Sequence, residues 1–437
     1  MSLSKTRLLH GVRLAHQKNT AQSSTVILPT PKRVTLPMRQ HLGVPCQCTV
    51  SPGEAVGRGQ PVGQCPNEAS FCSPVHASVS GTVKSIETID DPWGGQCEAV
   101  VIDSDGKQTP WDGLAKPSVA SREEFITAVK NSGAVGLGGA GFPTWVKLNL
   151  KNGQRAELLL VNAAECEPYI TSDYREMLEN TDDIEAGIQA VKTWLGIPRV
   201  IVAIEDNKPE AIERMRQRAT GTNAFEVFSL KSRYPRGAEK VVLHDAAGLV
   251  IPEGKLPIDV GALVMNVATV GFLGRYLRTG MPLVSRRVTV DGGAVCKPQN
   301  LLVPIGTPLS ALADFCQVDS KAARMAIMGG PMMGVAVESL DQPVLKNNNA
   351  VLFFDEKQAR LPETTLCIRC GKCLAVCPVR LAPAALERAY EAQDPDRLRR
   401  LKVNLCIECG CCAYVCPARR PLVQANRASK ALIKNKR

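Results

Sequence analysis

The sequence is poor in aromatic residues and lacks a hydrophobic run long enough to cross a membrane. Aromatic residues make up 4% of its 437 residues, and no groove-binding motif accompanies them. The most apolar long stretch, residues 258–273, contains Asp259 and Asn266. It is also shorter than the roughly twenty apolar residues that a transmembrane helix needs. We therefore expect no membrane span and no nucleic-acid partner.

A signal-peptide pattern is also missing, although the chain has 17 cysteines. Eight of them fall in two short segments near the C-terminus, which favours metal binding in a reducing compartment over a disulfide-rich secreted fold. The others show no ligand spacing beyond a weak C-x-C at residues 46 and 48. We expect these others to be packed, buried thiols: Cys46, Cys48, Cys65, Cys72, Cys97, Cys166, Cys296 and Cys316.

The two cysteine-rich segments are CIRCGKCLAVCP at residues 367–378 and CIECGCCAYVCP at residues 406–417. Both fit C-x2-C-x2-C-x3-C-P, the spacing of a protein with two [4Fe-4S] clusters, in which the fourth cysteine of each run ligates the other cluster. Zinc sites use paired C-x2-C ligands and fit less well. We therefore expect one cluster on Cys367, Cys370, Cys373 and Cys416, and the other on Cys406, Cys409, Cys412 and Cys377. Cys411 is surplus, and we expect a packed thiol there.

The segment between the two runs has apolar residues at helical spacing, and Pro395 marks a turn between two short helices. This pattern predicts a helical dicluster domain. Residues 351–437 hold 17 Lys+Arg against 8 Asp+Glu, so they carry +9 of the total charge of +11. Two anionic clusters would offset part of this charge. We expect the last residues to form a solvated basic tail, with an acidic partner or an anionic lipid surface as the alternatives.

A glycine-rich segment, AVGLGGAGFPT at residues 134–144, precedes the apolar AELLLVNAAECEP. Such a loop lets backbone N–H groups approach a phosphate or a flat ring, although glycine loops also serve tight packing alone. Apolar runs at 158–162, 200–204 and 225–228 then alternate with helical patterns at 181–195 and 208–218. This alternation predicts an α/β domain with a largely parallel sheet.

Near the N-terminus, VSPGEAVGRGQPVGQ and SPVHASVSGTVKSIE alternate short apolar runs with glycine turns, which predicts a small β-sandwich. The two segments resemble the halves of a biotinyl/lipoyl-like domain. No lysine stands in the attachment context, so we expect a structural, docking role. His76 is expected to be a packed or hydrogen-bonded histidine and not a ligand.

Four segments, GLGGAGFPT, LVNAAECEP, YPRGAEKVV (234–242) and MNVATV (265–270), resemble the FMN-site segments of the NADH-oxidising subunit of respiratory complex I. With GGPMMG at 329–334, the N-terminal segments and the cysteine runs, residues 30–420 are more similar still to the RnfC subunit of the Rnf electron-transport complex. The resemblance implies that the flavin or NADH neighbours are Gly138, Gly139, Gly141, Asn162, Glu165, Gly237, Glu239, Asn266 and Thr269.

This chain departs from the complex I pattern at Leu137, Ala164 and Ala268, where complex I has arginine, an acidic residue and glutamate. The departures fit the Rnf type better, and they support the flavin more strongly than the nucleotide. For Glu165 and Glu167 two interpretations stay open. They are surface or helix-capping carboxylates, or one of them orders the polar edge of the flavin or nicotinamide by hydrogen bonding.

The resemblance also implies a domain order. We expect an N-terminal extension, a biotinyl/lipoyl-like β-sandwich (a barrel-sandwich hybrid), a Rossmann-like α/β FMN/NADH domain, a β-grasp (SLBB-like) module, a helical dicluster ferredoxin domain and a basic tail. Their expected ranges are 1–29, 30–115, 116–285, 286–349, 350–425 and 426–437.

For function, the resemblance implies the electron-input subunit of a membrane ion-pumping NADH:ferredoxin oxidoreductase. Electrons would pass between NADH, FMN and the two [4Fe-4S] clusters, and then to a neighbouring iron-sulfur subunit. We expect no catalytic acid or base, and we expect a peripheral protein on the cytoplasmic face of the inner or plasma membrane, held there by its partners. The alternatives are a soluble flavin/iron-sulfur reductase such as a cobalamin reductase, and a ferredoxin-like relay with a vestigial nucleotide domain.

Overall fold

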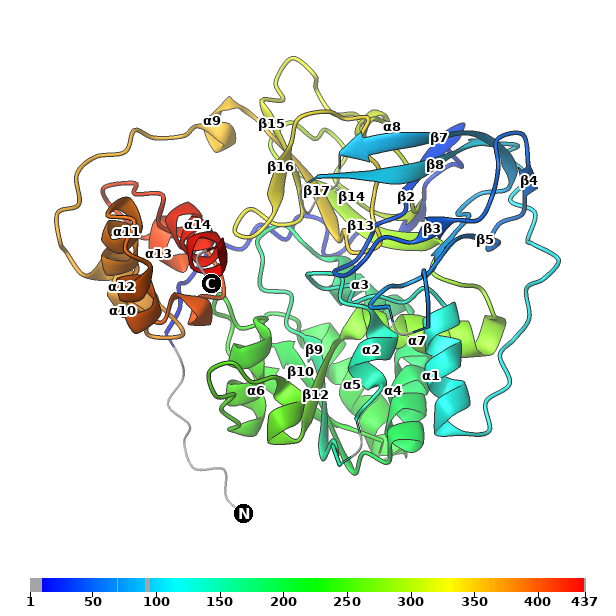
Figure 1. Cartoon of the computed structure of the whole chain (residues 1–437), viewed down its shortest axis with the longest axis horizontal. Coiled ribbons are helices and arrows are strands. Elements are labelled where there is room, and N and C mark those ends of the chain that lie inside the picture. Colours follow the sequence, from blue (N-terminus) through cyan, green and yellow to red (C-terminus); the bar gives the residue numbers. More distant parts are fainter. Residues whose placement is uncertain (1–9, 69, 91–94, 152, 223, 436–437) are drawn as a thin grey trace.

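The structure is a computed structural model that describes residues 10–68, 70–90, 95–151, 153–222 and 224–435. A parallel α/β domain occupies the lower centre of Figure 1, with two β-rich parts above it. A bundle of short helices lies at one side, joined to the rest by a long segment that follows α9. Within the described ranges, no helix is both long and apolar enough to cross a membrane.

The first β-rich part is a sandwich of two sheets, ordered β2-β8-β7-β4 and β3-β5-β6, with antiparallel pairing throughout. Val34, Leu36 and Ile102 are fully buried between its layers. This agrees with the alternating apolar pattern of the sequence. The strands are β2 (Arg33–Pro37), β3 (Gln47–Cys48), β4 (Ala55–Val56), β5 (Pro61–Gln64), β6 (Val75–His76), β7 (Gly81–Asp90) and β8 (Gln96–Ser104).

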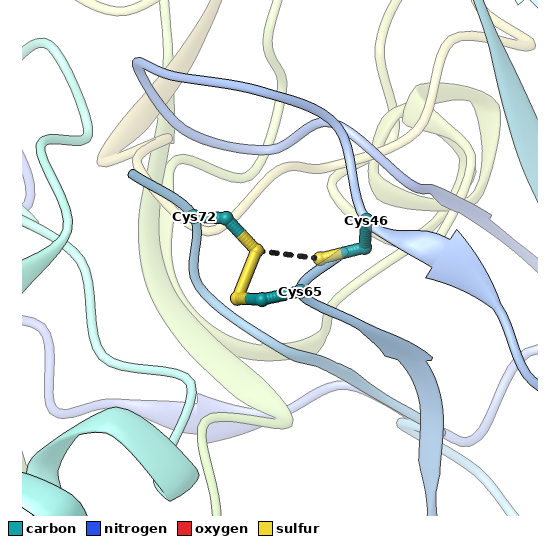
Figure 2. A group of neighbouring side chains, drawn as sticks. All are labelled: Cys46, Cys65 and Cys72. Atoms are coloured by element: carbon teal, nitrogen blue, oxygen red, sulfur yellow. Dashed lines mark hydrogen bonds between the residues drawn. A yellow bond between two sulfur atoms is a disulfide. The ribbon is translucent and has the colours of Figure 1, made fainter. Parts of the chain in front are cut away.

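The cysteines of this sandwich are not scattered, as the sequence suggested. Cys65 and Cys72 form a disulfide, and the Sγ atom of Cys46 lies 3.5 Å from that of Cys72 (Figure 2). Cys65 is also only partly buried. The prediction of isolated buried thiols is therefore wrong for these three, because the strand pairing of β3, β5 and β6 brings positions 46, 65 and 72 to one place.

Other cysteines differ from that expectation in their exposure. Cys296 is exposed, whereas Cys48 and Cys166 are partly buried. Cys316 is buried, as expected. His76 is also buried, in agreement with the prediction of a packed histidine.

The α/β domain has four parallel strands in the order β11-β10-β9-β12, which confirms the predicted parallel sheet. Its strands are β9 (Leu158–Ala163), β10 (Arg199–Glu205), β11 (Glu226–Leu230) and β12 (Ala262–Asn266). Its helices are α1 (Arg122–Asn131), α2 (Thr144–Leu148), α3 (Ser172–Glu179), α4 (Thr181–Leu195), α5 (Pro209–Thr222), α6 (Glu239–Ala247), η1 (Pro257–Val260) and α7 (Val267–Thr279).

Helices α4 and α7 pack in close contact. A Cβ atom added at Gly187 would lie 1.9 Å from the carbonyl oxygen of Val270, and one added at Gly274 would lie 2.0 Å from that of Asp183. Only glycine permits this approach. The packing fixes α7, whose first turn adjoins the glycine-rich loop.

The second β-rich part is a six-stranded sheet with the order β1-β14-β13-β17-β15-β16. Its strands are β1 (Val26–Ile27), β13 (Ser285–Asp291), β14 (Gln299–Pro304), β15 (Met325–Met328), β16 (Val335–Val337) and β17 (Ala350–Phe354), with helix α8 (Leu309–Phe315). The expected range of 286–349 was too short, because β1 pairs with β14 and β17 pairs with β13 and β15. Fully buried Val351 and Phe353 belong to this core, which is why β17 stays with the sheet.

The C-terminal part is helical, and Pro395 begins a second short helix, as predicted. Helix α14 packs against α11 and α12. The elements are α9 (Glu356–Ala359), α10 (Lys372–Val376), α11 (Pro383–Glu391), α12 (Pro395–Arg400), η2 (Val403–Leu405), α13 (Cys411–Tyr414) and α14 (Leu422–Asn435).

The predicted solvated basic tail is instead largely helix α14. Arg427 donates to Glu408 Oε2 at 2.8 Å, and Lys430 donates to Glu408 Oε1 and to the Cys406 carbonyl, both at 2.7 Å. These bonds hold the second cysteine segment, which is why the basic residues are ordered here. Lys434 is exposed on the same helix. Lys436 and Arg437 lie outside the described residues.

Residues 10–27 connect three parts of the molecule. Val12 and Tyr234 exchange backbone hydrogen bonds at 2.8 and 3.0 Å. The Thr20 carbonyl accepts a bond from Asn300 at 2.9 Å, and β1 then pairs with β14. In Figure 1 this segment runs from beside the helical part to the upper sheet. The N-terminal segment is therefore part of the fold.

Candidate functional site: a glycine loop beside two groups of cysteines

The glycine-rich loop turns back on itself between α1 and α2. The N–H group of Gly136 donates to the Phe142 carbonyl at 2.8 Å, and that of Leu137 donates to Thr269 Oγ1 at 2.9 Å. The N–H groups of residues 138–140, which are exposed, have no protein acceptor among the described residues. Free N–H groups at the tip of a glycine loop are able to bind an anion.

Asn266 joins this loop to helix α7. Its Oδ1 atom caps the helix by accepting from the N–H groups of Ala268 and Thr269 at 3.0 and 3.3 Å. Its Nδ2 atom donates to Asp173 Oδ2 at 2.6 Å. A Cβ atom on Gly138 would lie 2.6 Å from the same Nδ2 atom, so residue 138 must be glycine if Asn266 keeps this position.

Asn162 and Glu239 lie on segments that meet at the carboxyl end of the parallel sheet, where ligands bind in open α/β folds. Asn162 ends β9 and donates to the Gly237 carbonyl at 2.8 Å. Glu239 begins α6 and pairs with Lys147 at 3.0 Å. Lys147 also donates to the Val264 carbonyl of β12 at 2.9 Å. The four segments that the resemblance singled out are thus neighbours in space.

Glu165 has a left-handed backbone with φ of 52° and points its carboxylate at helix α3. Its Oε1 atom accepts from the Asp173 N–H group at 2.6 Å, which satisfies a free donor of the first helical turn. The capping interpretation is therefore correct for this oxygen. Its Oε2 atom and Asp173 Oδ1 are buried and have no hydrogen-bond partner in the described part of the chain. These two oxygens remain available to a ligand.

Two buried lysines compensate this acidic site. Lys18 donates to the carbonyls of Glu165, Glu167 and Ile170 at 3.0, 2.9 and 2.5 Å. Lys208 donates to the Ala164 carbonyl at 2.7 Å. Burial raises the pKa of Glu165, and the two ammonium groups oppose that rise.

Glu167 faces the upper sheet and the helical part. Its Oε2 atom accepts from the Met332 N–H group at 3.0 Å, whereas Oε1 is buried without a partner among the described residues. Burial raises the pKa of this carboxyl to about 7, although hydrogen bonds from the Met332 and Met333 backbone and the charge of Lys18 lower it. Glu167 is therefore not a solvated surface carboxylate.

The first group of cysteines lines a cavity of about 260 Å³ in the helical part: Cys367, Cys370, Cys373 and Cys416. Cys367 and Cys370 are exposed. Arg369 has φ of 55° and Gly371 has φ of 74°, so the chain turns sharply between the ligands of the run. The cysteine that comes from the other run lies with these three, as the predicted exchange of fourth cysteines requires.

The second group repeats this backbone, since Glu408 and Gly410 have φ of 55° and 80°. Burial raises the pKa of the Cys377 thiol, to which the charges of Cys409 and Cys406 add. Cys412 has Cys409, Cys406 and Cys377 as its charged neighbours. These thiols are more buried than the first group. Cys377 thus lies with the second run, and Cys416 lies with the first.

The second group also contacts the α/β domain. Cys409 and Cys411 belong to one apolar cluster with Tyr234 and Val12, against which Cys166 and Met332 pack. The Cys411 thiol lies 3.9 Å from the Tyr234 carbonyl and is 1% exposed, as expected of a packed thiol. In Figure 1 the helical part adjoins the side of the domain that carries α6. The buried group of cysteines therefore lies between the exposed group and the glycine loop side of the molecule.

Sequence reasoning missed three residues of this site: Lys18, Lys147 and Asp173. Lys147 follows the glycine loop by one helical turn, which was a signal within reach. Lys18 and Asp173 gave none, because Lys18 is 147 residues away from Glu165. Leu137, Ala164 and Ala268, the three departures from complex I, are buried and carry no charge toward the site.

Three family models match the chain. They are an RnfC barrel-sandwich hybrid domain at residues 6–107, a Nuo51 FMN-binding domain at residues 129–273 and a 4Fe-4S dicluster domain at residues 361–417. The first match agrees with the N-terminal sandwich, and the other two contain the glycine loop and the eight cysteines.

Full-length relatives, all of them RnfC subunits, are similar over most of the chain. The one from the proton-translocating ferredoxin:NAD(+) oxidoreductase complex of Clostridium ljungdahlii is 39% identical over 85% of this chain and 81% of its own length. The one from the Na(+)-translocating complex of Acetobacterium woodii is 38% identical over 84% and 83%. The one from the ion-translocating oxidoreductase complex of Rhodobacter capsulatus is 35% identical over 87% and 74%.

Among solved structures, two states of an NAD+-reducing [NiFe]-hydrogenase share the fold. The H2-reduced state has a TM-score of 0.50 at 18% identity, over 72% of this chain and 61% of the hydrogenase chain. The air-oxidised state has a TM-score of 0.51 at 19% identity, over 72% and 63%. This chain thus spans about three-fifths of each hydrogenase chain, and at this identity the likeness concerns the fold alone.

Proposed function

Because this chain belongs to the family of RnfC subunits of ion-translocating ferredoxin:NAD(+) oxidoreductase complexes, we propose that it carries electrons between NADH, an FMN and two [4Fe-4S] clusters. It is an oxidoreductase subunit, with an FMN-binding domain and a dicluster domain. The observation that carries the proposal is the order of its sites: a glycine loop, then a buried group of four cysteines, then an exposed one.

The residues around the glycine loop fit FMN. The exposed N–H groups at positions 138–140 can bind a phosphate, and buried Arg286 lies beneath them, donating to the Leu137 carbonyl at 2.5 Å. The unpartnered oxygens of Glu165 and Asp173 can accept from a flavin or nicotinamide N–H or O–H group. We assign flavin or NADH contacts to Gly138, Gly139, Gly141, Asn162, Glu165, Gly237, Glu239, Asn266 and Thr269.

When bound, FMN would accept an electron pair from NADH and release electrons singly, as clusters require. The chain's own residues position and shield this chemistry. Asn266 and Thr269 hold the loop, and Lys147 holds Glu239 at the end of the sheet. No side chain is assigned as a catalytic acid or base, since the carboxylates there are held by Lys18 and by the α3 N-terminus.

The two groups of cysteines would each hold one cluster. Cys377, Cys406, Cys409 and Cys412 would bind the inner one, which contacts the α/β domain through Tyr234. Cys367, Cys370, Cys373 and Cys416 would bind the outer one. Lys430 and Arg427 place positive charge beside the inner site, which favours its negatively charged thiolate–iron assembly.

A partner subunit would receive electrons beside the outer site. Large apolar side chains are exposed there and in the segment leading to it: Leu361 at 84%, Leu366 at 85%, Ile368 at 68% and Leu374 at 53%. Exposed apolar patches of this kind mark protein interfaces. We propose that an iron-sulfur subunit of the complex covers this patch, that the chain is held at the cytoplasmic face of the membrane through its partners, and that other subunits move the ion.

The test is an anaerobic reaction of the full chain assembled with iron, sulfide and FMN. NADH is added, flavin bleaching is followed by absorbance, and the clusters are followed by electron paramagnetic resonance. We expect bleaching and then cluster signals. If FMN binds but only an added chemical reductant bleaches it, the nicotinamide half of the proposal is wrong, and a reductase fed by another donor becomes the better description.

A further inference from the structure

The N-terminal sandwich contains three sulfur atoms that electron transfer does not use. The Sγ atoms of Cys46, Cys65 and Cys72 all lie within 4.8 Å of one another. Cys46 and Cys72 are buried, and Cys65 is partly exposed at the end of β5. Figure 2 shows the Cys65–Cys72 disulfide with the Cys46 thiol directed at it. Each sulfur comes from a different segment of the sandwich.

A buried positive charge without a carboxylate lies beside this cluster. Lys346 is 1% exposed, and its ammonium donates to the carbonyls of Pro74 and Gly133 at 2.5 and 2.8 Å. Among the described residues no carboxylate pairs with it, and its titratable neighbours are Cys46, His41 and His76. Burying an uncompensated ammonium is costly. A negative charge on the three sulfurs would compensate it.

We propose that Cys46, Cys65 and Cys72 bind one thiophilic divalent cation, with Zn²⁺ as the representative ion, when the Cys65–Cys72 disulfide is reduced. Zinc–sulfur bonds of about 2.3 Å place two thiolates of a tetrahedral site about 3.8 Å apart. The 3.5 Å between Cys46 and Cys72 Sγ fits that spacing. The sulfurs are also too close together for a polynuclear cluster, whose cysteines bind different metal atoms.

The chemistry balances with a dithiol as the reductant. The dithiol gives two electrons and two protons to the Cys65–Cys72 bond and becomes a disulfide itself, leaving two thiols in the protein. Binding of Zn²⁺ by the three thiols then releases three protons. The site carries one net negative charge, which the ammonium of Lys346 matches.

The site has an entry path and room for a fourth ligand. Cys65 lines a cavity of about 510 Å³ together with Gln64, Asn67, Glu68 and His76. An ion can therefore reach the sulfurs from the Cys65 side, and water can fill the fourth position, as in zinc sites with three protein ligands. Access from that side also exposes the disulfide to a dithiol.

The ion would clamp the sandwich against the α/β domain. The Cys72 carbonyl accepts from Trp145 Nε1 at 2.7 Å, and Ser73 Oγ donates to the Ala134 carbonyl at 3.3 Å. Trp145 belongs to α2, which directly follows the glycine loop. A metal on Cys72 therefore holds the segment that supports this loop. The proposal concerns metal content and does not depend on flavin or NADH binding.

The test uses the full chain with its clusters assembled, so that the other eight cysteines are occupied by iron. The protein is reduced anaerobically with dithiothreitol, incubated with Zn²⁺, desalted and analysed for zinc and iron by mass spectrometry. We expect one zinc per chain in the wild type and in the control Cys296→Ser, whose cysteine is exposed and distant from the sandwich cysteines in sequence. Cys46→Ser should lose that zinc and keep its iron.

A second measurement needs no substitution. Bound zinc should protect Cys65 from iodoacetamide in the wild-type chain, and a chelator should restore its alkylation, as read by peptide mass spectrometry. Zinc retained equally by the wild type and Cys46→Ser would show adventitious binding and overturn the proposal. So would a reduced wild-type chain that keeps no zinc, or a Cys65–Cys72 disulfide that persists under dithiothreitol.

Discussion

At the scale of single residues, buried charge organises the region around the glycine loop. Lys18 and Lys208 donate mainly to backbone carbonyls, so their charges act on Glu165 without forming a direct ion pair with it. Glu165 and Asp173 each keep one oxygen free among the described residues. A protein surface does not leave such groups unpaired at no cost, which is why they indicate a ligand site.

Glu167 should make stability depend on pH. Its pKa is raised to about 7 by burial, against about 4.5 in the unfolded chain. The folded state therefore favours the protonated acid, and its stabilisation is lost as the pH rises from about 4.5 to about 7. Glu167→Gln stays neutral and keeps an acceptor for the Met332 N–H group. We expect its thermal midpoint to exceed that of the wild type above pH 7, by several degrees, and to match it near pH 4.5.

The measurement is thermal unfolding of both proteins between pH 5 and 8, with the clusters assembled and under anaerobic conditions. A difference between the two midpoints that stays constant over this range would contradict the buried-acid interpretation, because only the titration of Glu167 makes the difference grow with pH.

At the scale of elements, the glycine loop depends on its contact with the first turn of α7. Asn266 holds that turn, Thr269 holds the loop, and Gly138 leaves the space that Asn266 fills. Glycine has a different role at position 139, where an added Cβ atom would meet nothing within 4 Å. The two positions thus separate the packing role of the loop from its proposed ligand role.

Gly138→Ala should displace Asn266, lower the thermal midpoint and weaken FMN binding. Gly139→Ala should leave the thermal midpoint of the flavin-free protein unchanged and still weaken FMN binding, by about tenfold or more, since the new methyl group projects where the backbone would approach the ligand. FMN affinity is measured by fluorescence titration. Undiminished affinity in Gly139→Ala would remove this loop from the flavin site.

The two cysteine runs are elements that exchange one residue each. Cys377→Ala should remove the cluster of the Cys406 run, and Cys416→Ala should remove that of the Cys367 run, because each alanine takes a thiolate from the other group. Each variant should lose about half of the iron. Electron paramagnetic resonance of the two reduced variants should show complementary signals. If each variant instead loses the cluster of its own run, the exchange is refuted.

At the scale of the whole molecule, the N-terminal segment holds the parts together. It pairs with Tyr234 beside the inner group of cysteines, places Lys18 under Glu165, and ends as a strand of the upper sheet. These contacts align the glycine loop side with the helical part. Short separations between redox sites therefore rest on residues that carry no redox group themselves.

Lys18→Met tests this alignment. The change leaves three buried carbonyls without their donor, and we expect a loss of about 2–4 kcal/mol of stability, seen as a thermal midpoint several degrees lower. Lys32→Met is the matched control, since Lys32 is exposed and its side chain makes no hydrogen bond in the described structure. Equal midpoints for the two variants would show that the segment is dispensable for the fold.

Much of this protein was determined locally by its sequence. Cysteine spacing within each run, the parallel strands at 158–163 and 199–205, and helix 181–195 follow from patterns of neighbouring residues, which is why they were predictable. Tertiary structure decided what depends on distant partners. Lys18 finds Glu165, β17 joins the upper sheet, Arg427 and Lys430 hold the Cys406 run, and Cys46 meets Cys65 and Cys72. No local period encodes these meetings, because they arise only when whole sheets and helices pack.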